Sequence, residues 1–153
     1  MMTMQSKPCG PTRSEKVAAI FSRPKYILFV DDDQRINELA REITQSFRAD
    51  LTIATSVGEA RDAINSGIPF DVVFLDVRLT NGNGVELYRE IAARFPKLKV
   101  IFMTAFFSDE LQSKIEAIGP ARVYSKPRLL DLRFLRQLFA QIGIGERQRA
   151  GVA

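Results

Sequence analysis

The sequence predicts an α/β protein with a doubly wound, five-stranded parallel sheet and five helices. Short apolar runs, typical of strands buried on both faces, alternate strictly with segments whose apolar residues recur at helical spacing. Strands and helices that alternate in this way are joined by right-handed crossovers, which place helices on both faces of the sheet. The content of 46% apolar and 26% charged residues is ordinary for a globular protein.

The first half of the chain contains two predicted strands and two predicted helices. Tyr26–Val30 is a continuous apolar run, and Leu51–Ala54 alternates as a short strand. Asp33 is placed to cap a helix after the first strand. Ser56-Val-Gly-Glu59 is a capping box, which opens a second helix that Gly67 closes. The apolar residues of the first helix are Ile36, Leu39, Ala40, Ile43 and Phe47.

The second half continues the pattern with three strands and three helices. Asp71–Leu75 and Val100–Met103 are typical of buried strands. Between them, a loop with Gly82 and Gly84 precedes a helix at Val85–Phe95, which a proline ends. The other elements are a helix that Ser108 caps, a strand at Ala121–Ser125 and a helix at Leu129–Ile142.

Residues 25–142 are predicted to form one domain between a basic arm and a polar tail. Residues 1–24 should be partly disordered, with a short helix opened by the capping box Thr12-Arg-Ser-Glu15. Residues 143–153 should fray. The net charge of +4 arises within the first 25 residues, which hold five basic side chains and one acidic one. The balanced charge of the remainder argues against direct nucleic-acid binding by the domain body.

The composition excludes several kinds of site. The absence of histidine excludes a Ser-His-Asp hydrolase, a histidine-ligated metal site and a histidine phosphodonor within this chain. The single cysteine, Cys9, excludes an internal disulfide and a cysteine-based zinc site. No apolar stretch is long enough to span a membrane, and no signal peptide is recognisable. We therefore expect a cytoplasmic protein.

Polar residues follow four of the five predicted strands at their carboxyl ends. They are Asp31-Asp32-Asp33 after the first strand, Asp76 after the third, Thr104 after the fourth and Lys126 after the fifth. Ligands of open parallel sheets bind at this edge, so these residues should converge if their strands are neighbours. Oxygen ligands without histidine or thiolate favour Mg²⁺, and a carboxylate can accept a phosphoryl group. The residues alone therefore suggest Mg²⁺-dependent phosphoryl transfer onto a carboxylate.

Residues 25–142 resemble the receiver (response-regulator) domain of bacterial two-component signalling, in its stand-alone form. The resemblance implies a flavodoxin-like sheet with strand order 2-1-3-4-5 and a signalling role rather than an enzymatic one. It also implies phosphorylation by a histidine kinase or a histidine phosphotransfer protein, with Mg²⁺ (or Mn²⁺) as the cofactor. The matching segments are Ile27-Leu-Phe-Val-Asp-Asp-Asp33, Val72-Val-Phe-Leu-Asp76, Met103-Thr-Ala105 and Val123-Tyr-Ser-Lys-Pro127, in the family's order and spacing.

The resemblance also implies a role for each residue at the carboxyl edge. The bond between Lys126 and Pro127 matches one that is usually cis in the family. Asp33 matches no site residue and is expected to act as a helix cap. The implied roles are Asp76 as phosphoacceptor, Lys126 as the phosphoryl-contacting lysine, Thr104 as the switch hydroxyl, and Asp31, Asp32, Asp76 and the backbone carbonyl of Arg78 as metal ligands.

Three departures from the family pattern concern the switch. Thr80 stands where proline is common, in a loop that should be mobile. Val123 stands at the position of the family's aromatic switch residue, and Tyr124, one place later, should point to the other face of the sheet. Phe106 should either crowd the site or, together with Phe107, pack under the next helix.

The last predicted helix carries more apolar residues than one buried stripe needs. Leu132, Phe134 and Phe139 fall outside that stripe, and Arg133 flanks them. Aromatic and arginine residues are enriched at interfaces. We therefore expect Phe134 and Phe139 to serve an interface rather than to complete the core. The face of the fourth helix, fifth strand and fifth helix should bind a downstream protein or a second copy of the chain.

Three other functions compete with a phosphorylated switch. A receiver fold can bind partners without switching, which Val123 and Thr80 favour. A phosphatase of the haloacid-dehalogenase type needs a second aspartate two residues after the nucleophile, where this chain has Arg78. A flavodoxin-like cofactor binder needs a first loop that cradles a phosphate, which the three aspartates after the first strand would repel.

Overall fold

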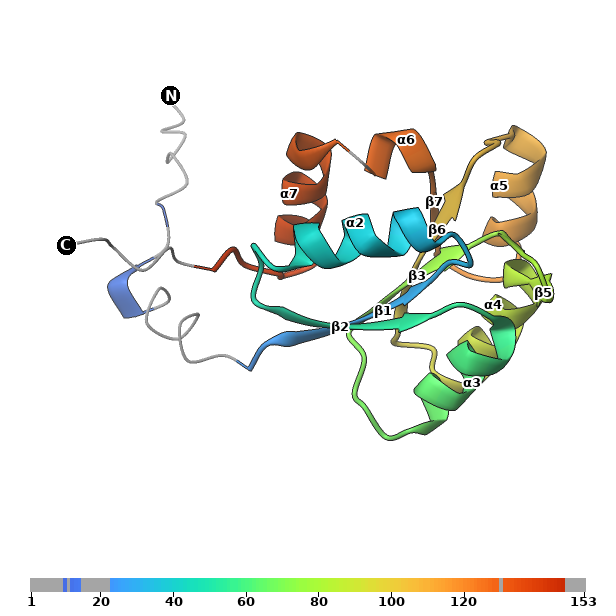
Figure 1. Cartoon of the computed structure of the whole chain (residues 1–153), viewed down its shortest axis with the longest axis horizontal. Helices are drawn as coiled ribbons and strands as arrows, with labels where there is room; N and C mark the ends of the chain where they lie inside the picture. Colours follow the sequence, from blue (N-terminus) through green and yellow to red (C-terminus); the bar gives the residue numbers. More distant parts are fainter. Residues whose placement is uncertain (1–9, 11, 15–22, 130, 148–153) are drawn as a thin grey trace, which may run out of the picture.

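Five parallel strands form one sheet in the order β2-β1-β3-β6-β7 (Figure 1). The structure is a computed structural model that describes residues 10, 12–14, 23–129 and 131–147. The strand order confirms the predicted order 2-1-3-4-5, and it makes the first and third strands neighbours. The strands are β1 (Lys25–Val30), β2 (Ala49–Ala54), β3 (Val72–Asp76), β6 (Lys99–Thr104) and β7 (Arg122–Ser125).

Helices cover both faces of the sheet, as the alternating pattern predicts (Figure 1). On one face lie α2 (Gln34–Thr44) and α7 (Leu132–Gln141), and on the other lie α3 (Val57–Asn65), α4 (Gly84–Arg94) and α5 (Asp109–Glu116). None of the helices built from the described residues is long and apolar enough to cross a membrane.

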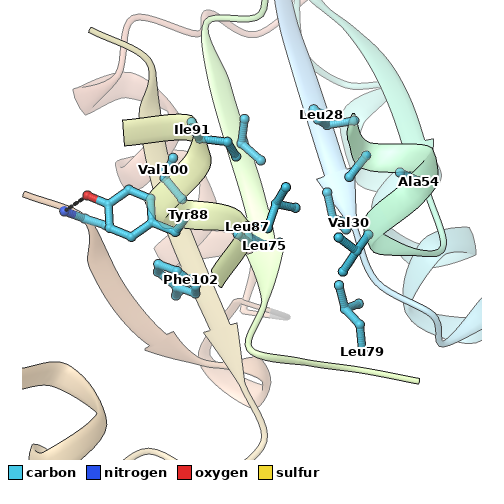
Figure 2. Packing of buried hydrophobic residues seen from close by; sticks show 14 of the residues in the cluster. Leu28, Val30, Ala54, Leu75, Leu79, Leu87, Tyr88, Ile91, Val100 and Phe102 are labelled. Carbon is cyan, nitrogen blue, oxygen red and sulfur yellow. Dashed lines mark hydrogen bonds between the residues drawn. The ribbon is translucent and has the colours of Figure 1, made fainter. Parts of the chain in front are cut away.

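Each face of the sheet contributes to its own apolar core. Leu28 and Val30 belong to the cluster beneath α3, α4 and α5, whereas Ile27 belongs to the cluster beneath α2 and α7. Figure 2 shows the first cluster, in which the ring of Tyr88 meets that of Phe102 edge-on, with centroids 5.3 Å apart. Successive strand residues point to opposite faces, so the continuous apolar runs of the sequence fill both cores.

Three helix caps are as predicted. The side chains of Asp33, Ser56 and Ser108 accept hydrogen bonds from backbone N–H groups in the first turns of α2, α3 and α5. Gly67, after the end of α3, has φ of +88°, a conformation that glycine adopts without a steric penalty. These local signals explain why the elements begin and end close to their predicted positions.

The last predicted helix is interrupted, so the prediction of one helix over Leu129–Ile142 was wrong. A short helix, α6 (Lys126–Leu129), precedes Asp131, whose extended backbone and side-chain oxygen cap α7. The peptide bond between Lys126 and Pro127 is trans, contrary to the cis bond that the resemblance implied, and no cis bond occurs among the described residues. Phe139 is 4% exposed, and its ring centroid lies 4.6 Å from that of Phe47. Phe139 therefore completes the core, contrary to the expectation that it serves an interface.

The loop after β3 is a small hairpin rather than the loose segment expected. Its strands, β4 (Arg78–Leu79) and β5 (Gly82–Asn83), pair antiparallel. Asn83 then caps α4 by accepting a hydrogen bond from the backbone N–H of Val85, at 2.8 Å. The Asn-Gly-Asn-Gly composition therefore serves a turn and a helix cap.

The two ends of the domain are tied to its body. Arg23 donates two hydrogen bonds to the carboxylate of Asp71, at 3.0 and 2.9 Å. Ile144 is 2% exposed, and the backbone of Arg147 donates to the carbonyl of Ser46 at 2.8 Å. The prediction that the chain frays from residue 143 is thus wrong as far as residue 147. The helix expected to begin at Thr12 and the partial disorder expected over residues 1–24 fall mostly outside the described residues.

The burial of Ile144 gives a direct test of this C-terminal packing. Ile144→Ala should lower the free energy of unfolding by about 2 kcal/mol, because it removes buried methyl groups and leaves a cavity. Ile68→Ala is the matched control, since Ile68 is 37% exposed, and its cost should stay within about 0.5 kcal/mol. Urea unfolding measures both, and equal costs would contradict the packing described for Ile144.

Candidate functional site

Three carboxylates meet at the carboxyl edge of the sheet. One carboxylate oxygen from each of Asp31, Asp32 and Asp76 lies within 4.8 Å of the others. The pairing of β1 with β3 brings the first and third strand ends together, as predicted. Asp31 and Asp76 are buried, at 0% and 4% exposure, whereas Asp32 is exposed. Mutual repulsion of such charges is relieved by a cation or by protonation.

Lys126 provides one cation to this cluster. Its Nζ lies 2.8 Å from Asp31 Oδ2 and 2.9 Å from Asp76 Oδ2. Its position at the start of α6, directly after β7, aims the side chain across β6 towards β1 and β3. Burial by itself lowers the pKa of Lys126, but the adjacent carboxylates outweigh that effect and raise the pKa above its usual value. Lys126 is therefore charged and bridges both buried aspartates.

The carboxylate of Asp76 is held on both of its oxygens. Oδ1 accepts a hydrogen bond from the backbone N–H of Arg78 at 3.2 Å, and Oδ2 accepts one from Lys126. Burial raises the pKa of Asp76 above its usual value, and the charge of Asp31 adds to this shift. The hydrogen bond and charge of Lys126 offset the shift only in part. Three carboxylates around one ammonium leave an excess of negative charge in this site.

The oxygens of the cluster fit a hard cation such as Mg²⁺. Asp31 Oδ1 accepts a hydrogen bond from the backbone N–H of Asp33 at 2.9 Å. Asp31 Oδ2 is buried, and within the described part of the chain its partner is the Lys126 ammonium at 2.8 Å. A buried carboxylate oxygen with a second lone pair, beside two further carboxylates, offers the ligands that Mg²⁺ prefers. The carbonyl of Arg78 as a further ligand stays a prediction, and the Arg78 side chain is exposed.

Thr104 lies at the same edge, but its hydroxyl faces its own loop. Thr104 is 6% exposed; its Oγ1 donates to the carbonyl of Phe106 and accepts from the N–H of Phe106, both at 3.1 Å. Phe106 is 75% exposed and Phe107 is 46% exposed. The alternative that both phenylalanines pack under the next helix was therefore wrong, whereas crowding of the site by Phe106 stays a prediction.

Comparison with known proteins agrees with this geometry. The model of the response regulator receiver domain family matches residues 27–135. The chain belongs to this family. The match confirms the resemblance seen in the sequence at the level of the family. Receiver domains are signalling modules rather than classical enzymes.

The receiver domain is similar to parts of longer regulators. It is 36% identical over 115 residues to the response regulator protein PilR of Pseudomonas aeruginosa, covering 74% of this chain and 25% of PilR. It is 46% identical over 57 residues to the DNA-binding transcriptional activator DevR/DosR of Mycobacterium tuberculosis, covering 37% of this chain and 26% of that protein. The chain thus spans about a quarter of the length of these curated relatives.

Solved receiver structures superpose on most of the chain. The BeF3-activated DrrB receiver domain is 28% identical with a TM-score of 0.64, and the match covers 77% of this chain and 98% of that one. DrrB is a Thermotoga maritima protein. A CheY-like receiver domain protein from Methanospirillum hungatei is 26% identical with a TM-score of 0.69, covering 78% and 94%.

The two candidate switch residues of this receiver lie on opposite faces of β7. Val123 packs against the core beneath α3, α4 and α5, and Tyr124 packs against the other core, as alternation predicts. The ring of Tyr124 meets that of Phe134 edge-on, with centroids 5.0 Å apart, and the Arg128 guanidinium lies 4.4 Å from the Phe134 centroid. Phe134 is half-buried, whereas Arg133 next to it is exposed.

Three residues that position the acidic cluster are not evident from the sequence pattern. Asn37, a buried polar residue of α2, donates through Nδ2 to the backbone carbonyl of Asp31 at 2.9 Å. Thr80 donates through its N–H and its hydroxyl to Asp32 Oδ2. Gly84 lies so close to β3 that a Cβ atom there would stand 2.1 Å from the carbonyl oxygen of Asp76. Of the three, only Asn37 leaves a signal in the sequence, because it is a polar residue among the apolar residues of an amphipathic helix.

The close approach of Gly84 predicts a cost for any side chain at this position. Gly84→Ala should destabilise the domain by about 1–3 kcal/mol, because the added methyl group meets backbone that cannot rotate away. Gly58→Ala in α3 is the control: its nearest neighbour would lie at 3.8 Å, and removing a helical glycine should be neutral or stabilising by up to about 1 kcal/mol. Thermal unfolding compares the two; a Gly84→Ala domain as stable as the wild type would refute the contact.

Proposed function

We propose that this receiver domain accepts a phosphoryl group on Asp76 and passes the change on by protein binding. The phosphodonor is the phosphohistidine of a histidine kinase or a histidine phosphotransfer protein, which places the domain in the cytoplasm. The observation that carries the proposal is the meeting of Asp31, Asp32 and Asp76 with Lys126 at the carboxyl edge. We assign this function to residues 25–142 together with the packed segment that continues to residue 147.

The proposed reaction is an in-line transfer in which Asp76 is the nucleophile. An oxygen of the Asp76 carboxylate attacks phosphorus, the bond from phosphorus to the histidine nitrogen breaks, and the imidazole leaves with the electron pair. The Lys126 ammonium, 2.9 Å from Asp76 Oδ2, is placed to pair with an oxygen of the incoming phosphoryl group. Asp31, Asp32, Asp76 and the carbonyl of Arg78 would hold Mg²⁺, which supplies neutralising charge for the carboxylates and the phosphoryl oxygens when bound.

The proposed signal begins at Thr104. Its hydroxyl would leave the backbone of Phe106 and donate to a phosphoryl oxygen, which frees the loop that carries the exposed Phe106 and Phe107. The face built from α5, β7 and α7 adjoins this loop and presents Leu132 at 51% exposure together with Arg133. We propose that this face binds a downstream protein or a second copy of the chain.

Intact mass tests the proposed reaction. The protein is incubated with acetyl phosphate or phosphoramidate, with Mg²⁺ or with excess chelator. We expect a gain of one phosphoryl group that needs Mg²⁺ and is absent in Asp76→Asn. A protein that binds Mg²⁺ but gains no mass with either donor would contradict the proposal.

A constitutive interaction module is the second candidate function. Val123 replaces the expected aromatic switch residue, and Tyr124 is packed against Phe134 on the opposite face. Hydrogen exchange with and without beryllofluoride and Mg²⁺ separates the candidates. A switch should change the protection of backbone amides in both the Phe106 loop and α7, whereas a constitutive module should change neither.

A further inference from the structure

The turn of the β4–β5 hairpin places two hydrogen-bond donors on the outermost carboxylate of the acidic cluster. The backbone N–H of Thr80 donates to Asp32 Oδ2 at 2.8 Å, and the Thr80 hydroxyl donates to the same oxygen. These residues are 48 positions apart, so the contact depends on the hairpin lying over the end of β1.

Two donors on one oxygen determine how the carboxylate can bind a cation. A carboxylate oxygen offers two lone pairs in its plane, and Thr80 uses Oδ2 for both of its donors. Oδ1 is then the oxygen of Asp32 with lone pairs to offer a shared ligand. Asp32 is exposed, so packing does little to restrict its rotamers. The two bonds therefore replace packing as the restraint on this side chain.

We propose that Thr80 is a positioning residue for the cation site, which holds Asp32 in the orientation that completes the set with Asp31 and Asp76. This inference rests on the proposed Mg²⁺ site. Carboxylate ligands of metals are commonly oriented by hydrogen bonds from a second layer of residues, and loss of such a bond typically weakens metal affinity by about 10- to 100-fold. Proline, the residue expected here from the resemblance, has neither an N–H nor a hydroxyl.

Calorimetric titration of the full chain with MgCl₂, without any phosphodonor, tests this role. Thr80→Val removes the hydroxyl and keeps the shape, and we expect its Kd for Mg²⁺ to rise about tenfold. Thr80→Ser keeps both donors and should restore the wild-type Kd within about twofold. Thr55→Val is the matched control, because the Thr55 hydroxyl donates to the Glu59 carboxylate at 2.8 Å in the cap of α3. Its Kd should be unchanged.

The outcomes separate the role of Thr80 from the proposed function. Equal Kd values for wild type and Thr80→Val, in a protein that binds Mg²⁺, would overturn the role of Thr80 and leave the phosphoacceptor intact. A rise in Kd shared by Thr80→Val and Thr55→Val would also overturn it, because the effect would then follow general destabilisation. A wild-type protein that binds no Mg²⁺ would overturn both proposals. Urea unfolding of each variant establishes that the titrated proteins are folded.

Discussion

Lys126→Met is expected to lower the free energy of unfolding by about 3 kcal/mol at pH 7 in metal-free buffer. The lysine Nζ lies within 2.9 Å of both buried aspartates, and removing one partner of a buried ion pair leaves uncompensated charge that costs about 3–5 kcal/mol. The Lys126 side chain is 18% exposed, so solvent screening places the expected value at the low end of that range. The same substitution should slow phosphorylation by acetyl phosphate about 100-fold or more, because it removes the charge that faces the phosphoryl oxygens.

Lys114→Met provides the control for Lys126→Met. Lys114 pairs with Glu110 one turn away at 3.0 Å, and its side chain is 65% exposed. Such a surface pair contributes about 0.3–0.5 kcal/mol, so the control should change stability little. Urea unfolding gives both values. If Lys126→Met costs no more than Lys114→Met, then Lys126 does not offset the charge of the two buried aspartates.

Mg²⁺ is expected to stabilise the wild-type domain by about 2.7 kcal/mol at a concentration 100 times its Kd. Asp76→Asn should depend less on the metal: it should be more stable than the wild type without Mg²⁺ and gain much less stability from Mg²⁺. The reason is the excess of buried negative charge, which either the cation or the amide relieves. Thermal unfolding with MgCl₂ and with chelator measures these shifts, and NaCl at equal ionic strength controls for general salt effects.

The difference in unfolding free energy between the wild type and Asp76→Asn should change with pH in a direction that the pKa of Asp76 determines. The pKa of Asp76 is raised above the usual 3.8 by burial and by Asp31. The folded protein therefore holds a proton on Asp76 more tightly than the unfolded chain does. The stabilisation from this proton is complete below about pH 3.8 and is lost as the pH rises through the folded-state pKa. The stability advantage of Asp76→Asn in metal-free buffer should accordingly grow over this window and level off above the folded-state pKa; a constant or shrinking advantage would contradict the raised pKa.

The strands and most helix ends could be predicted because their signals are local. The apolar runs of β1 and β3 and the caps Asp33, Ser56 and Ser108 act within one turn or one strand. The break before α7 could not be predicted, because apolar residues continue at helical spacing on both sides of Asp131, so the sequence gives no sign that Asp131 caps a new helix. Ile144 was missed because one apolar residue in a polar tail gives no periodic signal, and its burial depends on contacts near residue 47.

The residues of the acidic cluster were also predictable, whereas the residues that position them were not. Asp31, Asp32, Asp76 and Lys126 occur at strand ends, and strand order alone brings them together. Thr80 and Gly84 act through contacts with Asp32 and Asp76 that only the hairpin creates. Contacts that depend on the conformation of a turn cannot be predicted from the spacing of apolar residues.

Chemical mapping of the phosphoryl group tests the central claim most directly. The protein is incubated with acetyl phosphate and Mg²⁺, and borohydride reduction then converts any aspartyl phosphate to homoserine, which peptide mass spectrometry locates. We expect homoserine at position 76 in the wild type, and none there in the presence of chelator or in Asp76→Asn. Homoserine at another aspartate, or at none while Mg²⁺ binding is demonstrated, would contradict Asp76 as the phosphoacceptor.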